Sequence, residues 1–126
     1  MQGFQQKAIE NISSAKILYD NQFYNASVNR SYYAIFHSAI NALSINGYDI
    51  KRISHEATQA LFAGELIKRK KLFPSKLKAY LNQLRVIRNA ADYEPEQITQ
   101  KIARRQLGKA QEFLEIVLKE STNVKS

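Results

Sequence analysis

Arg88 and Asp92 are the first residues of this sequence whose type and spacing suggest chemistry. They lie in the stretch "RVIRNAADYEP". On a helix of 3.6 residues per turn, Arg88 shares one stripe with four apolar residues, Leu77, Leu81, Leu84 and Ala91. A guanidinium stays charged, so an arginine on an apolar face needs a partner or a ligand. Asp92, four residues later, offers a partner, whereas an arginine in a cleft or a subunit interface can bind a phosphate with two hydrogen bonds.

The two histidines are the other candidates for catalysis. Arg30 and His37 are seven residues apart, so they lie along one edge of a helical apolar face. His37 could be a structural, hydrogen-bonded histidine or could approach Arg88 across a bundle. His55 is predicted to begin a helix, where the positive end of the helix dipole lowers the pKa of an imidazole and favours its neutral, basic form. The candidate catalytic residues are therefore Arg88, Asp92, His55 and His37.

Positive charge is concentrated in one part of the chain. Residues 51–88 hold ten Lys or Arg and two Glu, which equals the whole net charge of +8. A local basic zone favours a polyanion such as RNA or DNA. The alternative is that "KRKK", residues 68–71, only ends a helix and keeps the chain soluble. The candidate RNA- or nucleotide-binding residues are Arg88, Asn89, Tyr93, Arg30, Lys68, Arg69, Lys70 and Lys71.

Helical elements must position these residues, because no segment shows the alternation of a strand. Five helices are predicted, over residues 4–19, 25–45, 55–71, 74–93 and 96–120. Asn46-Gly47 should end the second, Ser54 should cap the third, and Pro74 suits the first turn of the fourth. The expected fold is all-α, an up-and-down four-helix bundle with an additional short helix. Residues 1–126 should form a single domain with a disordered tail from about residue 121.

Composition excludes several classes of function. The chain has no cysteine, which rules out disulfides and thiolate metal sites and favours a cytoplasmic protein. No apolar run reaches the 18 residues of a membrane span, and the N-terminus lacks the layout of a secretion signal. Glycine-rich phosphate loops, nucleophile elbows and metal-ligand spacings are absent. No cofactor, metal or membrane partner is expected.

Four segments together resemble the HEPN domains of prokaryotes. They are "ASVNRSYYAIFHSAINAL", "SHEATQALFAGELI", "LRVIRNAADYEP" and "ARRQLGKAQEFLEIVL". The resemblance as a whole extends over nearly the entire chain, from about residue 5 to 118. The sequence is most similar to a branch of small stand-alone HEPN proteins whose fourth helix ends in R-x-x-A-D-Y, here residues 88–93.

This resemblance implies a helical bundle that dimerises. Many HEPN proteins are metal-independent ribonucleases, often toxins paired with a small nucleotidyltransferase antitoxin. Their motif is an arginine, often followed by a polar residue, with a histidine four to six residues further on. Carried over, the arginine is Arg88 and the polar residue is Asn89. The positions expected to hold histidine read Tyr93, Glu94 and Pro95.

The missing histidine favours a binding role over catalysis, and two functional hypotheses follow. Without it, the usual general acid or base for attack by a ribose 2′-hydroxyl is absent from the motif. The first hypothesis is a homodimeric binding module for RNA or nucleotide, partnered with a nucleotidyltransferase in a toxin–antitoxin-like system. The alternative is a metal-independent ribonuclease toxin that uses Arg88 with a histidine from elsewhere, His55 or His37.

Overall fold

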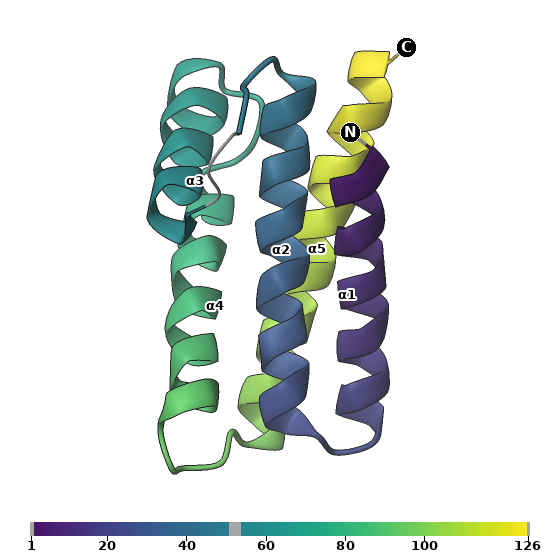
Figure 1. Cartoon of the computed structure of the whole chain (residues 1–126), viewed down its shortest axis with the longest axis vertical. Helices are drawn as coiled ribbons and strands as arrows, with labels where there is room; N and C mark the ends of the chain where they lie inside the picture. Colours follow the sequence, from purple (N-terminus) through teal and green to yellow (C-terminus); the bar gives the residue numbers. More distant parts are fainter. Residues whose placement is uncertain (1, 51–53, 126) are drawn as a thin grey trace.

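The computed structural model describes residues 2–50 and 54–125, and these residues form helices and loops without any strand. The elements are α1 (Gln2–Asp20), α2 (Tyr24–Ile45), α3 (His55–Leu61), η1 (Phe62–Arg69), α4 (Lys76–Tyr93) and α5 (Gln100–Lys125). Four long helices and one shorter helical segment make up an up-and-down bundle (Figure 1). The predicted all-α fold with five helices is thereby confirmed. No helix among the described residues is long and apolar enough to cross a membrane.

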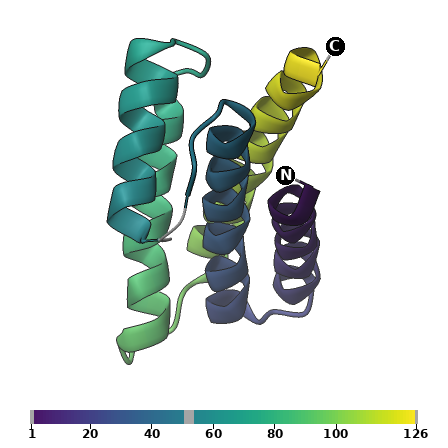
Figure 2. The ribbon, with the colours of Figure 1, turned by 45° about the horizontal axis from the view of Figure 1, so that its top comes forward.

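Helix α2 is central, because α1, α3, η1, α4 and α5 all contact it. In Figure 2, α1 and α5 lie on one side of α2, while α3 and α4 lie side by side on the other. Local signals set the ends of these helices as predicted. Gly47 follows α2 with a φ of 91°, a left-handed conformation that glycine adopts without strain. The Ser54 hydroxyl caps α3 by accepting the Ala57 N–H at 3.1 Å.

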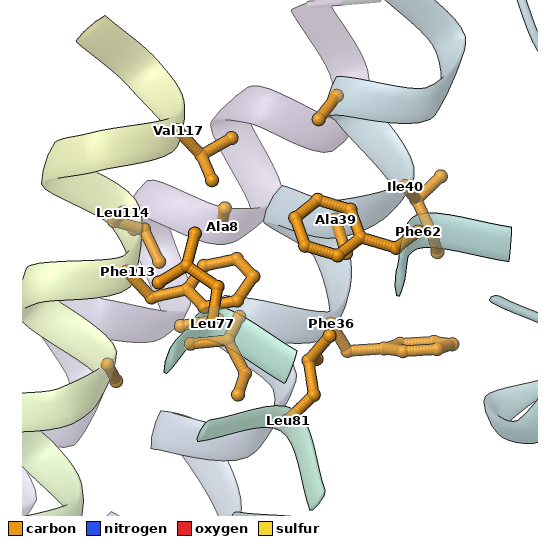
Figure 3. Close-up of a cluster of buried hydrophobic side chains, with 14 of the residues drawn as sticks. Ala8, Phe36, Ala39, Ile40, Phe62, Leu77, Leu81, Phe113, Leu114 and Val117 are labelled. Atoms are coloured by element: carbon orange, nitrogen blue, oxygen red, sulfur yellow. The ribbon is translucent and has the colours of Figure 1, made fainter. Parts of the chain in front are cut away.

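The hydrophobic core joins both sides of α2. Phe62 of η1 stacks between Phe73 and Phe113, with ring centroids 5.5 and 5.6 Å apart. Leu77 and Leu81 of α4 reach the same cluster, as Figure 3 shows. Every residue of the predicted stripe on the fourth helix is buried: Leu77, Leu81, Leu84, Arg88 and Ala91. The 3.6-residue period therefore assigned the inner face of α4 correctly, arginine included.

The predicted third helix changes its winding halfway. After Leu61 the chain forms a π-helix, in which the Lys70 N–H donates to the Glu65 carbonyl at 2.9 Å, five residues back. Gly64 lies within this segment and lowers the preference for a regular α-helix. Phe62 and Leu66 are both buried here, so the segment keeps its apolar side on the core.

Three predicted helix ends, one in α4 and two in α5, were wrong by a few residues. Helix α4 begins at Lys76 rather than at Pro74, whose carbonyl accepts the Leu77 N–H at 3.1 Å just before the helix. Helix α5 begins at Gln100 rather than near residue 96 and continues to Lys125 rather than ending near residue 120. No glycine or proline occurs after Gly108 to stop it. The disordered tail from about residue 121 and the single domain over 1–126 stay predictions.

Candidate functional site

Arg88 faces a pair of tyrosines on α2 and not a leucine core. Its guanidinium carbon lies 5.1 Å from the ring centroid of Tyr32 and 5.5 Å from that of Tyr33. The residue is only 8 % exposed. Its Nη1 is 3.5 Å from Asp92 Oδ2, at the limit of a hydrogen bond. Arg88 Nε is buried and has no acceptor among the described residues.

His55 meets Arg88 across Tyr32. The histidine is the first residue of α3, and its ring stacks on Phe36 with centroids 4.5 Å apart. His55 Nδ1 forms a short hydrogen bond with the Tyr32 hydroxyl. The structure therefore brings two predicted catalytic residues, 33 positions apart in sequence, into contact with the same buried tyrosine. We call Arg88, Asp92, Tyr32, Tyr33 and His55 the Arg88 cluster.

Burial and positive charge set the protonation of the Arg88 cluster. Burial raises the pKa of Tyr32 to about 12, although Arg85 and Arg88 oppose the shift. Burial, with repulsion by Arg88 and Arg85, lowers the pKa of His55, whereas Glu56 raises it. His55 is therefore neutral at pH 7, and Tyr32 keeps its proton. Two positive arginines beside a neutral imidazole form a site suited to an anion.

Asp92 connects the Arg88 cluster to the far side of α2. Asn29 Nδ2 lies 3.0 and 3.3 Å from the two Asp92 carboxylate oxygens. Arg30 in turn donates to Asn29 Oδ1 through Nε at 2.9 Å and Nη2 at 2.6 Å. Through Nη1 it donates to Asn11 Oδ1 at 2.9 Å. A hydrogen-bonded chain of side chains thus joins α1, α2 and α4.

The structure places His37 at the α1 end of this chain. Arg30 holds Asn11 Oδ1 as an acceptor, so Asn11 Nδ2 donates to His37 Nδ1 at 3.1 Å. The proton of the neutral ring is then on Nε2. Phe4 of α1 also packs on the ring, with centroids 5.8 Å apart. His37 and Arg30 share an edge of α2 as predicted, but His37 reaches Arg88 only through intervening side chains.

The predicted nucleic-acid-binding residues separate onto different surfaces. Lys68 lines a groove between η1 and α4. Arg69 turns away from it to pair with Glu65 at 2.8 Å, and Lys70 lies over the Tyr48 ring at 5.2 Å. Lys71 is exposed just after η1. Asn89 and Tyr93 are exposed on α4. Two further cations of the basic zone, at positions 51 and 52, lie outside the described residues.

Sequence reasoning missed Tyr32, Arg85 and Asn29. Tyr32 falls at core spacing on α2, so its hydroxyl gave no signal of its own. Arg85 is three residues before Arg88, which places the two on neighbouring turns of α4. This three-residue spacing from Arg88 is the sequence signal that could have identified Arg85 as a site residue. Among the described residues, no three His, Asp or Glu side chains lie close enough to hold a metal ion.

Comparison with known proteins gives one family. The family model described as "HEPN domain" matches residues 1–121. Two curated proteins of Methanocaldococcus jannaschii are similar to the chain. "Putative toxin MJ0605" is 62 % identical over 32 residues, which cover 25 % of this chain and 24 % of that protein. "Putative toxin MJ0142" is 32 % identical over 89 residues, which cover 71 % of this chain and 58 % of that protein. The chain thus matches less than two thirds of either relative.

Proposed function

Because the chain belongs to the HEPN domain family, we propose that it is a toxin-like protein that forms a homodimer and binds RNA at the Arg88 cluster. We also propose that a nucleotidyltransferase is its antitoxin partner and that the pair acts in the cytoplasm. The family match over residues 1–121 and the toxin names of two relatives support the toxin-like role. The binding role is supported by the cluster itself.

The unsatisfied charge of Arg88 is the observation that carries this proposal. A buried arginine that served only to tie helices together would be fully paired, because an unpaired buried charge is costly. Arg88 instead has one long contact with the carboxylate of Asp92, contacts with the neutral side chains of Tyr32 and Tyr33, and a buried Nε without an acceptor among the described residues. Its planar donors match the geometry of a phosphate. Arg85, on the preceding turn and more exposed, extends the positive charge toward solvent.

The outer face of α4 supports the homodimer. Three of its exposed residues follow a spacing of three and four positions: Val86, Asn89 and Tyr93. Val86 is 65 % exposed and Tyr93 77 % exposed, so two large apolar side chains lie on a helix surface with polar residues between them. Such a stripe suits a helix of a second copy. A dimer through this face would pack the α4 helices of two copies against one another.

The placement of His55 favours a second function, metal-independent cleavage of RNA. Its lowered pKa keeps the ring neutral, and a tautomer that donates Nδ1–H to Tyr32 Oη leaves Nε2 as a base. The base would remove the proton of a ribose 2′-hydroxyl, whose oxygen attacks the adjacent phosphorus. The bond from phosphorus to the 5′-oxygen breaks, and the departing oxygen takes up a proton from solvent water. Arg88 would balance the charge that develops on the phosphate. The products are a 2′,3′-cyclic phosphate and a free 5′-hydroxyl.

The test compares binding and cleavage in one set of variants. Purified wild type, Arg88→Lys, His55→Gln and His37→Gln would be incubated with fluorescent single-stranded RNA in EDTA. Arg88→Lys keeps the charge but loses the forked donors, so RNA binding should weaken about tenfold or more, the scale of one good bidentate contact. His37→Gln is the matched control, because His37 is hydrogen-bonded to Asn11 and contacts the cluster at the Tyr33 ring rather than at Arg88. All variants should show the wild-type circular dichroism.

Each outcome has one reading. Binding that falls in Arg88→Lys but not in His37→Gln supports the RNA site. Binding that is equal in all four proteins would contradict it. Cleavage that His55→Gln abolishes, with a cyclic phosphate product, supports the ribonuclease function. If the wild type leaves the RNA intact both as a monomer and as a dimer, the ribonuclease function is refuted and the protein is a binding module.

A further inference from the structure

A groove runs between α3–η1 and α4, one helical turn from Arg88. Its volume is about 750 Å³, within the range of small-molecule sites. The floor is apolar and includes Ala60, Ala63 and Leu81. Gly64 of the π-helix also lines it, and a Cβ added there would meet no atom within 4 Å. Irregular helical turns of this kind are frequent at functional sites.

Cations flank the groove on both sides. Lys68 comes from η1, and Lys78 and Arg85 come from α4. Among the described residues, Lys68 and Lys78 form no ion pair, while Arg85 pairs with Glu56 at 3.0 Å. Glu56 is strongly exposed and is the one acid that lines the groove. The excess of positive charge therefore favours an anionic occupant.

A pair of amides bridges the groove between its two walls. Gln59 Nε2 of α3 donates to Asn82 Oδ1 of α4 at 2.9 Å. Gln59 Oε1 is buried without a hydrogen-bond donor among the described residues. The Asn82 amide hydrogens remain as donors on an exposed residue. An exposed amide with free donors is suited to the edge of a nucleobase, and a small rotation of Gln59 would turn its unpaired Oε1 to the same edge.

We propose that this groove binds a nucleoside monophosphate group, either free or as one nucleotide of a single RNA strand. The base would lie on the apolar floor with its edge at Gln59 and Asn82, and the phosphate would meet Lys68 and Lys78. Arg85 connects this groove to the Arg88 cluster, since it lines the groove and also lowers the pKa of His55. The inference deepens the proposed RNA-binding function and gives it a place where base identity is read.

The test fills the groove without touching its charges. Gly64→Leu adds a side chain at a residue that lines the groove, and the control Gly108→Leu adds the same side chain on α5, away from the groove; a Cβ added at either position meets no atom within 4 Å. Both changes replace a helical glycine, so both should fold. The probes are AMP, GMP, CMP and UMP, a five-nucleotide RNA, and inorganic phosphate, each titrated by calorimetry. Gly64→Leu should weaken nucleotide or RNA binding at least tenfold, and Gly108→Leu should change it less than twofold.

The outcomes separate this inference from the proposed function. If Gly64→Leu and wild type bind nucleotides equally well, the proposal that the groove binds a nucleotide is refuted, even where Arg88→Lys abolishes RNA binding. Inorganic phosphate that binds as tightly as AMP would also refute the proposal, because the apolar floor would then add nothing to the affinity for the nucleoside. Loss of nucleotide binding in Gly64→Leu with normal RNA binding in Arg88→Lys would support the groove and refute the Arg88 site. If Gly64→Leu weakens binding of the five-nucleotide RNA and the wild type binds no free mononucleotide, the natural occupant is one nucleotide of an RNA strand.

Discussion

Arg88→Leu is the substitution that separates a structural arginine from a functional one. It replaces the charged residue of the α4 stripe by the apolar residue that the pattern of Leu77, Leu81 and Leu84 would favour. A guanidinium that serves only the fold should leave a large loss of stability when it is removed. A guanidinium retained for a ligand should leave little loss, and the protein should instead lose its binding.

The contacts of Arg88 suggest a small change in stability. Its two tyrosine contacts contribute about 1 kcal/mol each, and Leu would lose them. Against this, the substitution removes a buried Nε without a partner, a penalty of about 1–3 kcal/mol, and buries an apolar side chain. Asp92 keeps its contacts with Asn29, and its side chain is 27 % exposed. The free energy of unfolding should stay within about 1 kcal/mol of wild type, as is common when a buried ion is replaced by an apolar group.

Urea unfolding followed by circular dichroism at 222 nm measures this difference. The control is Leu84→Ala on the same stripe, where loss of a fully buried leucine should cost about 2–5 kcal/mol. RNA binding should be lost in Arg88→Leu and kept in folded Leu84→Ala. A loss of about 3 kcal/mol or more in Arg88→Leu, comparable with the control, would refute the reasoning and make Arg88 a structural residue.

Three further predictions concern the tyrosine, the histidines and the outer face of α4. Tyr32→Phe keeps the ring but removes the hydroxyl that His55 contacts, so it should lower the free energy of unfolding by about 1 kcal/mol and slow any RNA cleavage in a fluorescence assay. The pKa values of His37 and His55 are lowered by folding, so the unfolded chain binds more protons below pH 6.5, and stability should fall between pH 7.5 and 5.5. In His37→Gln this loss of unfolding free energy should be smaller, as measured by urea titrations at the two pH values. An unchanged loss would contradict the role of His37 in it. Val86→Glu should turn the proposed dimer into a monomer in light scattering, whereas a wild type that is already monomeric would refute the dimer.

The sequence was sufficient for the inner faces of the helices, because these depend on local periodicity alone. Arg88 on the α4 stripe, the Ser54 cap and the stop at Gly47 each follow from residues less than two turns apart. The π-helical winding after Leu61 did not follow, since it depends on how Phe62 and Leu66 fit the core.

The candidate site was predictable only in part, since its contacts cross between elements. His55 and Tyr32 are 23 residues apart and meet through the docking of α3 on α2, which no local pattern encodes. The same docking separates Lys68 from Arg69 and Lys70, three neighbours that a charge count treats as one patch. His37 and Arg88 were possible neighbours by periodicity, and the packing of α1 on α2 placed His37 elsewhere.

The position of α4 in the bundle has a consequence for motion. Figure 2 shows α3 and α4 on the other side of α2 from α1. Helix α4 packs chiefly on α2 and makes a smaller contact with α5, where the Tyr80 hydroxyl donates to Glu112 Oε1 at 2.6 Å. Partial unfolding usually proceeds by such units and needs less free energy than unfolding of the whole chain. Amide hydrogens of α4 should therefore exchange with solvent faster than those of α2. Such an opening would expose the guanidinium of Arg88, which is nearly covered in the closed bundle. The rate at which α4 opens would therefore limit how fast a phosphate reaches it.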